Sequence, residues 1–306
     1  MKQVKIYLML IGFAVFTGMT FNLAKYAVAF LTPSHVAAWR FGIAGVVMIG
    51  VLFFKEGLQL SSLKQNALWY IIIGVIGIFG FNTFFFLGMN HTSPVNGSLI
   101  MALNPLVTTI FARLILKDKI HKNGVIGIFF GFTGVLFVLT KGSLSTFTHL
   151  SFSIGDLFLF AGNLCWALYG VLSRRFIKNG TALSTTTYTM VAGAIGLIIM
   201  SAFTASESSV SVPIGVWGAV IFMALFTTVL GYLWWNRGMK KLGATKTSLF
   251  FNLVPIVTML TSVWSGIPIT LVQVGGTVLV ILGVLVSSGA ITFSSMEERK
   301  MQKCIS

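Results

Sequence analysis

The chain has 306 residues, of which 56% are hydrophobic and only 9% are charged, and its mean hydropathy is +0.93. This composition leaves too little polar surface to cover a soluble globule, so it indicates an integral membrane protein. The net charge of +15 would suit a nucleic-acid partner, but the Lys and Arg residues lie in short turns between apolar spans, as in membrane proteins.

Ten apolar segments are long enough for membrane-spanning helices, which need roughly 20 residues, and none shows the ~10-residue alternation of a membrane β-barrel. We expect the first five spans near Tyr7–Ala29, Pro33–Phe54, Trp69–Met89, Pro94–Leu116 and Asn123–Thr140. We expect the second five near Ile154–Arg174, Thr185–Phe203, Trp217–Trp235, Thr245–Ser265 and Val272–Ser288. The first span is too long for a cleaved signal peptide, so we expect it to remain.

The cations in the connections are strongly biased to one side. Seventeen of the 21 Lys and Arg residues fall in connections on one face of the expected bundle, whereas Lys141 alone lies on the other. The positive-inside rule therefore predicts a multi-pass protein of the cytoplasmic membrane with both termini in the cytoplasm. Five spans per half then place the second half upside down relative to the first.

An internal repeat relates the two halves. The stretch SLIMALNPLV at Ser98–Val107 returns as SLFFNLVPIV at Ser248–Val257, and the same shift matches Pro105 with Pro255. Inverted repeats with proline-broken helices at matching positions are typical of transporters, and the breaks indicate the substrate site. We expect a first five-helix repeat at 7–140, an external linker at 141–153, a second repeat at 154–290 and a cytoplasmic tail at 291–306.

Three motifs of the second half are distinctive. They are Gly155-Asp156, the run from Trp166 to Tyr169 that leads to Ser173-Arg174-Arg175, and the stretch Gly231–Val257. With these motifs the chain resembles the EamA-type ten-helix exporters of the drug/metabolite transporter superfamily. It departs from the family pattern at Thr17, where a Trp is usual, and at Pro268, where an acidic residue is usual. The resemblance implies alternating-access efflux of small metabolites, such as amino acids, nucleosides or related amphipathic compounds.

Three cations fall inside spans, where a charge costs ~2.5–3.5 kcal/mol even on the mildest scale. Arg113 is near a span end and can extend to water. Lys25 lies roughly 10 Å past the middle of its span, so it either contacts substrate or reaches the outer interface. Arg40 lies roughly 10 Å below the outer surface and either pairs with Asp156 or receives an anionic group of the substrate.

Uncharged polar and aromatic residues near mid-span complete the candidates for substrate contact. Each can equally serve as interhelical glue or packing. Because proline has no N–H, Pro105 and Pro255 free the carbonyls of Met101 and Phe251, which must then face protein or a wet cavity. Besides Arg40, the candidates are Asn82, Ser98, Asn104, Trp166, Tyr169, Tyr232, Ser248 and Asn252.

The spans lack the groups that enzyme chemistry needs. The four histidines lie outside span cores, and the sequence has no Ser/His/Asp arrangement and no P-loop, so we expect no catalytic residue, metal or cofactor. The acids also lie outside span cores, which leaves Asp156 and Lys25 as coupling candidates. The partners expected are a small-molecule substrate and the bilayer. A secondary exporter is the leading interpretation, and the alternatives are a channel-like facilitator or sensor, or an intramembrane enzyme acting on a lipid.

Overall fold

The computed structural model describes residues 2–118, 122–139, 153–204, 211–266 and 268–287, and all regular structure within them is helical. The expected linker and tail lie outside these residues apart from Ser153. The first half contains α1 (Lys2–Ala27), α2 (Pro33–Glu56), α3 (Leu60–Gly74), η1 (Val75–Gly80), α4 (Phe81–His91), α5 (Pro94–Met101), α6 (Asn104–Phe111), η2 (Ala112–Leu116) and α7 (Lys122–Leu139).

The second half repeats this order. It contains α8 (Ile154–Phe176), α9 (Ala182–Ala202), α10 (Ile214–Phe222), η4 (Met223–Gly231), α11 (Tyr232–Lys241), α12 (Ala244–Ser248), η5 (Leu249–Leu253), α13 (Val254–Trp264) and α14 (Leu271–Ser287). Several of these elements join end to end, so each half of the chain forms five rods, and the predicted all-α membrane fold is confirmed.

Eight of the ten rods are long and apolar enough to cross a membrane, and the described parts of α7 and α14 contain shorter apolar helices. The third rod, Leu60–His91, begins nine residues before the predicted span at Trp69. Its first turns carry Lys64, Gln65 and Asn66, because a helix continues past the apolar stretch into the polar connection. The eighth rod, Ile214–Lys241, likewise continues past the predicted end at Trp235 into the polar stretch Asn236–Lys241, and it begins three residues before the predicted start at Trp217.

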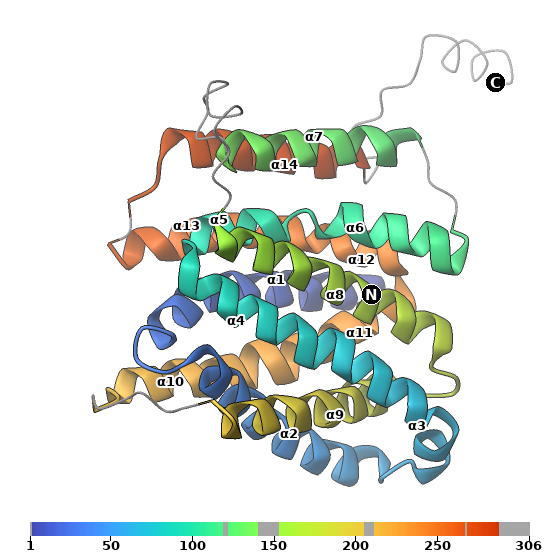
Figure 1. Cartoon of the computed structure of the whole chain (residues 1–306). Helices are drawn as coiled ribbons and strands as arrows, with labels where there is room; N and C mark the ends of the chain where they lie inside the picture. The colour runs from blue at the N-terminus through green and yellow to red at the C-terminus, as the bar shows by residue number, and fades with distance from the viewer. Residues whose placement is uncertain (1, 119–121, 140–152, 205–210, 267, 288–306) are drawn as a thin grey trace, which may run out of the picture.

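Reciprocal contacts show that an approximate two-fold axis relates the halves. A Cβ on Gly134 would lie 2.6 Å from the carbonyl oxygen of Gly276, and one on Gly283 would lie 2.5 Å from that of Gly127. These four glycines are two repeat-related pairs that exchange partners, so α7 and α14 cross closely and run antiparallel. Figure 1 shows the two helices side by side along one edge of the bundle. An axis that relates antiparallel spans lies in the plane of the membrane, as inverted repeats require.

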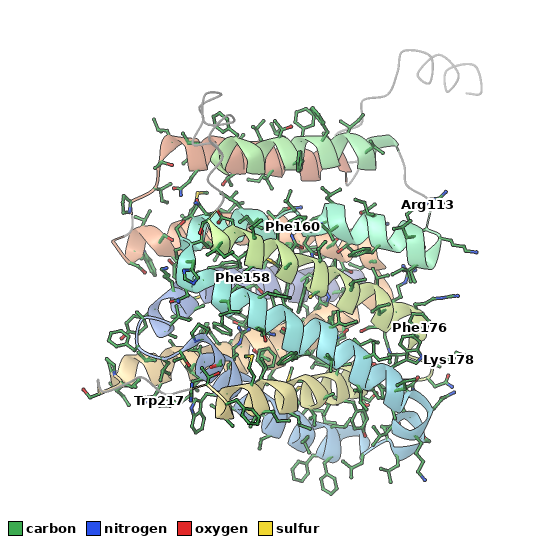
Figure 2. All side chains as sticks on the ribbon, viewed as in Figure 1. Arg113, Phe158, Phe160, Phe176, Lys178 and Trp217 are labelled. Atoms are coloured by element: carbon green, nitrogen blue, oxygen red, sulfur yellow. The ribbon has the colours of Figure 1, made fainter. Side chains whose placement is uncertain are left out.

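The same exchange occurs inside the bundle. Gly88 of α4 packs against Leu159 of α8, and its repeat partner Gly238 of α11 packs against Leu10 of α1. The first rod of each half therefore packs on the third rod of the other half. Figure 2 shows Arg113 and Lys178 at one end of this bundle and Trp217 at the other.

Irregular helix occurs at matching places in the two halves. The fourth rod breaks between Met101 and Asn104, just before Pro105, and the ninth rod narrows to the 3-10 segment η5 just before Pro255. The third and eighth rods contain the π-helical segments η1 and η4, which overlap after a shift of 150 residues. Such π segments occur frequently at functional sites.

Candidate functional site

A narrow pocket of about 20 Å³ lies where the irregular segments of both halves meet. We call it the central pocket. Two of its lining residues, Met101 and Phe251, are repeat partners. Met101 is the last residue before the break in the fourth rod, and Phe251 lies in η5, just before Pro255. The full lining is Phe13, Thr17, Thr20, Phe21, Arg40, Phe81, Phe85, Met101, Trp166, Thr227, Tyr232 and Phe251.

The two-fold axis passes beside this pocket. Asn82 and Tyr232 are repeat partners, and the Asn82 amide donates a hydrogen bond of 3.3 Å to the Tyr232 hydroxyl. Each residue lies just after a π segment: Asn82 is the second residue after η1, which ends at Gly80, and Tyr232 is the first after η4, which ends at Gly231. The π segments thus bring two equivalent polar side chains together at the centre of the bundle.

Trp166 is the centre of an aromatic cluster at the pocket. It is 1% exposed, and its ring lies 4.7 Å from that of Tyr232, 5.0 Å from Phe81 and 5.9 Å from Phe251, measured between ring centroids. The ring of Phe13 is nearly parallel to it at 6.3 Å. Flat faces and edges from both halves therefore surround the space, which suits a ligand with an aromatic or apolar body.

Arg40 brings a full charge to the same space. The side chain is 2% exposed, and its Nε–H donates a hydrogen bond of 2.7 Å to the Thr228 hydroxyl on η4. Its guanidinium carbon lies 5.2 Å from the Phe41 ring centroid and 5.8 Å from that of Phe86. Among the described residues no carboxylate pairs with it.

Several buried polar atoms at the pocket lack a hydrogen-bond partner among the described residues. They are the Thr17 hydroxyl, the Trp166 indole N–H and the amide oxygen of Asn82. Leaving such a group unsatisfied costs about 1–3 kcal/mol, so each would gain from a polar ligand atom. By contrast, Thr20 and Thr227 satisfy each other through a hydrogen bond of 2.7 Å.

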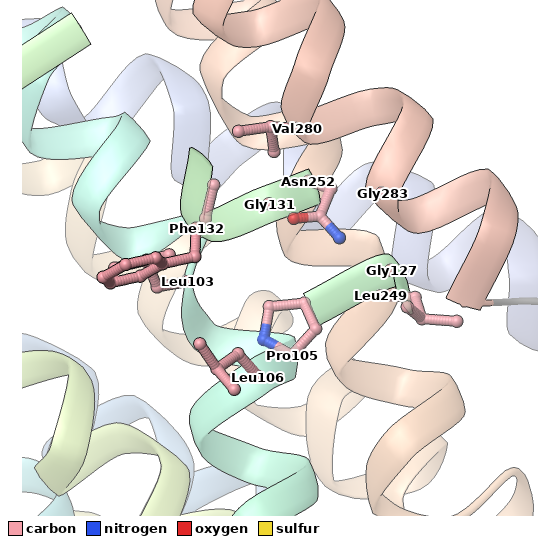
Figure 3. A pocket seen from close by; sticks show the side chains of 11 residues that line it. Leu103, Pro105, Leu106, Gly127, Gly131, Phe132, Leu249, Asn252, Val280 and Gly283 are labelled. Carbon is pink, nitrogen blue, oxygen red and sulfur yellow. The ribbon is translucent and has the colours of Figure 1, made fainter. Parts of the chain in front are cut away.

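A second pocket, also of about 20 Å³, lies between the broken rods and the helices α7 and α14. Figure 3 shows Pro105 and Asn252 in it, with the Asn252 amide projecting toward the glycine-bearing helices α7 and α14. Of the described residues that line it, Asn252 is the one with a polar side chain, and none is charged. This lining therefore offers a polar ligand much less to recognise than that of the central pocket.

The remaining predicted contact residues lie outside both linings. The hydroxyls of Ser98 and Ser248 donate to carbonyls three residues earlier, those of Val95 and Thr245. Asn104 donates to Asn163 of α8, a hydrogen bond between rods.

Tyr169 lies directly behind the central pocket. Its ring stacks on Trp166 at 5.5 Å, and its hydroxyl accepts a hydrogen bond of 2.6 Å from Asn236. It therefore fixes the orientation of the Trp166 ring from behind.

The Arg40–Asp156 pair, one of the two interpretations of Arg40, does not form. Asp156 accepts hydrogen bonds from the Thr92 hydroxyl at 2.8 Å and the Ser153 N–H at 3.2 Å, the latter in a capping box at the start of α8. The cap holds this carboxylate at the end of α8, whereas Arg40 reaches inward from α2 to η4. Lys25 instead caps the end of α4, with its ammonium 3.0 Å from the Met89 carbonyl and 3.2 Å from that of Asn90.

Sequence reasoning missed most of the apolar lining. Four phenylalanines of the central pocket, at positions 13, 21, 81 and 85, look like lipid-facing residues in the sequence. One signal was available at Thr17, which is the repeat partner of Trp166 at a shift of 149. The pair faces one space from opposite halves of the molecule.

Comparison with known proteins agrees with this architecture. The EamA-like transporter family matches residues 4–140 and 153–289, so the chain belongs to this family of membrane transporters, which is not an enzyme family. The predicted family and the absence of enzyme function are thereby confirmed.

Among its relatives, "Uncharacterized transporter YyaM" of Bacillus subtilis (strain 168) is 63% identical over 292 residues, which cover 95% of this chain and 96% of the relative. "Aromatic amino acid exporter YddG" of Ancylobacter novellus is 26% identical over 260 residues, or 84% of this chain and 88% of the relative. A solved crystal structure matches with a TM-score of 0.70 at 23% identity and covers 92% of this chain and 96% of its own, which shows the shared fold.

Proposed function

We propose that this transporter is a secondary carrier that exports small amphipathic metabolites across the cytoplasmic membrane, with the central pocket as its substrate site. The observation that carries the proposal is the position of that pocket. It lies beside the two-fold axis, between rods that are broken or π-helical in both halves, and it combines an aromatic lining with Arg40.

The width of the pocket favours alternating access over an open channel. In this conformation the central pocket has room for about one water molecule. A metabolite therefore enters only when the halves rearrange, and the irregular segments supply the places where the rods can bend. Rocking of inverted halves around a fixed midplane site is the motion that such repeats permit.

Export, and not import, is proposed from the similarity to the aromatic amino acid exporter and from the predicted orientation. Seventeen Lys and Arg residues mark the cytoplasmic side. The end of the bundle that carries Arg113 and Lys178 is then cytoplasmic (Figure 2). Asp156 and Lys25 cap helix ends at the opposite, outer side.

Counterflow in proteoliposomes tests the proposal. Vesicles that contain the purified protein are loaded with a mixture of amino acids, nucleosides and aromatic carboxylates, and the exchange of each isotope-labelled compound is followed by mass spectrometry. We expect saturable exchange of a subset, absent from protein-free vesicles. Trp166→Ala should abolish it, whereas Trp264→Ala, at a side chain that is 93% exposed, should not. Protein-dependent exchange of no compound would overturn the proposal, and non-saturable flux would indicate a channel.

A further inference from the structure

We propose that the central pocket selects monoanionic amphiphiles, with a carboxylate on Arg40 and an aromatic or apolar body against Trp166, and that it disfavours zwitterions and cations. This inference rests on the proposed function of the pocket. It goes further because it names the charge of the substrate. The substrate class that it names also differs from the aromatic amino acids in the name of the relative.

The charge of Arg40 lacks compensation. A guanidinium has five N–H donors, and only its Nε–H has an acceptor among the described residues, the Thr228 hydroxyl. The Phe41 and Phe86 rings offset part of the cost, since a cation–π contact contributes about 0.5–2 kcal/mol. A charge inside the membrane costs at least ~2.5–3.5 kcal/mol, and a buried ion costs several kcal/mol. An anion that enters the pocket therefore supplies the counter-charge and the hydrogen-bond acceptors that the Arg40 guanidinium lacks.

The free donors suit a carboxylate in particular. The planar guanidinium fork presents two parallel N–H groups, which match the two oxygens of a carboxylate. The unpartnered Trp166 indole N–H and Thr17 hydroxyl face the same pocket and can donate to further oxygens of the ligand. A ring bound between them would lie among the faces of Phe13 and Phe251.

The pocket offers no equivalent for an ammonium group. Among the residues that the structure describes, no Asp or Glu lines it. The acids in the described part of the chain are engaged elsewhere: Glu56 accepts from Thr181, Asp118 pairs with Arg174, and Asp156 caps α8.

The free acceptor beside the pocket, the Asn82 amide oxygen, is uncharged. An ammonium would therefore lose its hydration without a counter-charge, and Arg40 would repel it. The α-ammonium of an amino acid therefore weakens its binding at this site. The same molecule without its amine does not lose affinity in this way.

A matched set of three ligands tests the inference. Phenylacetate, phenylalanine and phenethylamine share a ring and differ in charge, being an anion, a zwitterion and a cation at pH 7. Isothermal titration calorimetry on the full-length protein in detergent measures their affinities. We expect phenylacetate to bind at least tenfold more tightly than phenylalanine, and phenethylamine to bind weakest.

Substitution of the arginine separates the charge from the rest of the pocket. Arg40→Met should weaken phenylacetate binding at least tenfold, Arg40→Lys should weaken it less, and Arg113→Met, at an exposed arginine near a span end, should leave it unchanged. If Arg40→Met does not fold, the three-ligand comparison on the unsubstituted protein decides.

Equal or tighter binding of phenylalanine, in a protein that still shows counterflow, would overturn the inference and leave the proposed function standing. Absence of both binding and counterflow would overturn both.

Discussion

The hydrogen-bond pair of Asn104 and Asn163 ties α8 to the broken fourth rod and gives a quantitative test of the structure. Both side chains are fully buried. Asn104 donates to the Asn163 amide oxygen at 2.8 Å, and Asn163 donates to the Ile100 carbonyl at 2.9 Å. Ile100 lies in the last turn of α5, next to Met101 of the central pocket, so the pair positions the break against α8.

Asn163→Leu removes both hydrogen bonds and keeps the branched shape of the side chain, with two methyl groups in place of the amide oxygen and nitrogen. Interhelical hydrogen bonds in membrane proteins contribute ~0.6 kcal/mol each on average, so two contribute about 1.2 kcal/mol. The Ile100 carbonyl keeps its bond from the Leu103 N–H, but the Asn104 amide loses its acceptor, which costs a further 1–3 kcal/mol or so. We therefore expect the free energy of unfolding to fall by about 2–4 kcal/mol.

A double-mutant cycle with Asn104→Leu isolates the pair. Unfolding by SDS in mixed micelles, followed by tryptophan fluorescence, gives the free energy of each variant. We expect the double variant to lose less than the sum of the single variants, by about 0.5–1.7 kcal/mol, because the second substitution removes an already unpaired group. Thr133→Val is the control, since among the described residues this hydroxyl bonds within α7, to the Phe129 carbonyl. Additive losses within ~0.3 kcal/mol would refute the pairing.

Three further predictions concern topology, the prolines and coupling. In a cysteine-free background, an impermeant reagent added outside should label a cysteine at Ser145 and spare one at Asn123; the opposite pattern would contradict the inverted orientation. Pro105→Ala and Pro255→Ala should abolish counterflow without lowering thermal stability, because alanine supplies the backbone N–H that proline lacks and lets the helix continue through the break; wild-type counterflow in the double variant would reduce the prolines to packing residues. Because none of the described carboxylates lies in the central pocket, flux should persist after the pH gradient is collapsed; strict dependence on the gradient that survives Asp156→Asn would exclude this coupling scheme.

Properties that are local in the chain could be predicted from the sequence. Ten apolar segments, their helical state and the duplication follow from hydropathy and from the 150-residue match. Irregular backbone before Pro105 and Pro255 follows from the missing N–H of proline, and the structure has it at both places, although the Phe251 carbonyl, expected to be free, accepts the Val254 N–H. Arg40, Trp166 and Tyr232 were predicted as contact residues, and the structure brings these three into one lining.

Other features depend on the packing of rods from opposite halves. The π segments η1 and η4 carry no residue that requires an extra backbone position, so nothing in the sequence indicates them. The sequence shows that Arg40 and Asp156 carry opposite charges, but it does not show how far apart they lie. Only the packed structure shows that Asp156 caps α8 and that Arg40 bonds to Thr228 instead.

The sequence by itself determined that this is a duplicated helical membrane protein with a proline break in each half, because hydropathy, repetition and the chemistry of proline act along the chain. Only the tertiary structure decided which of its many apolar side chains form a site. Trp166 is 1% exposed and Trp264 is 93% exposed, yet both are tryptophans in apolar helices. In a membrane, lipid and protein interior favour the same side chains, so residue type cannot distinguish the surface from the central pocket, and helix packing does.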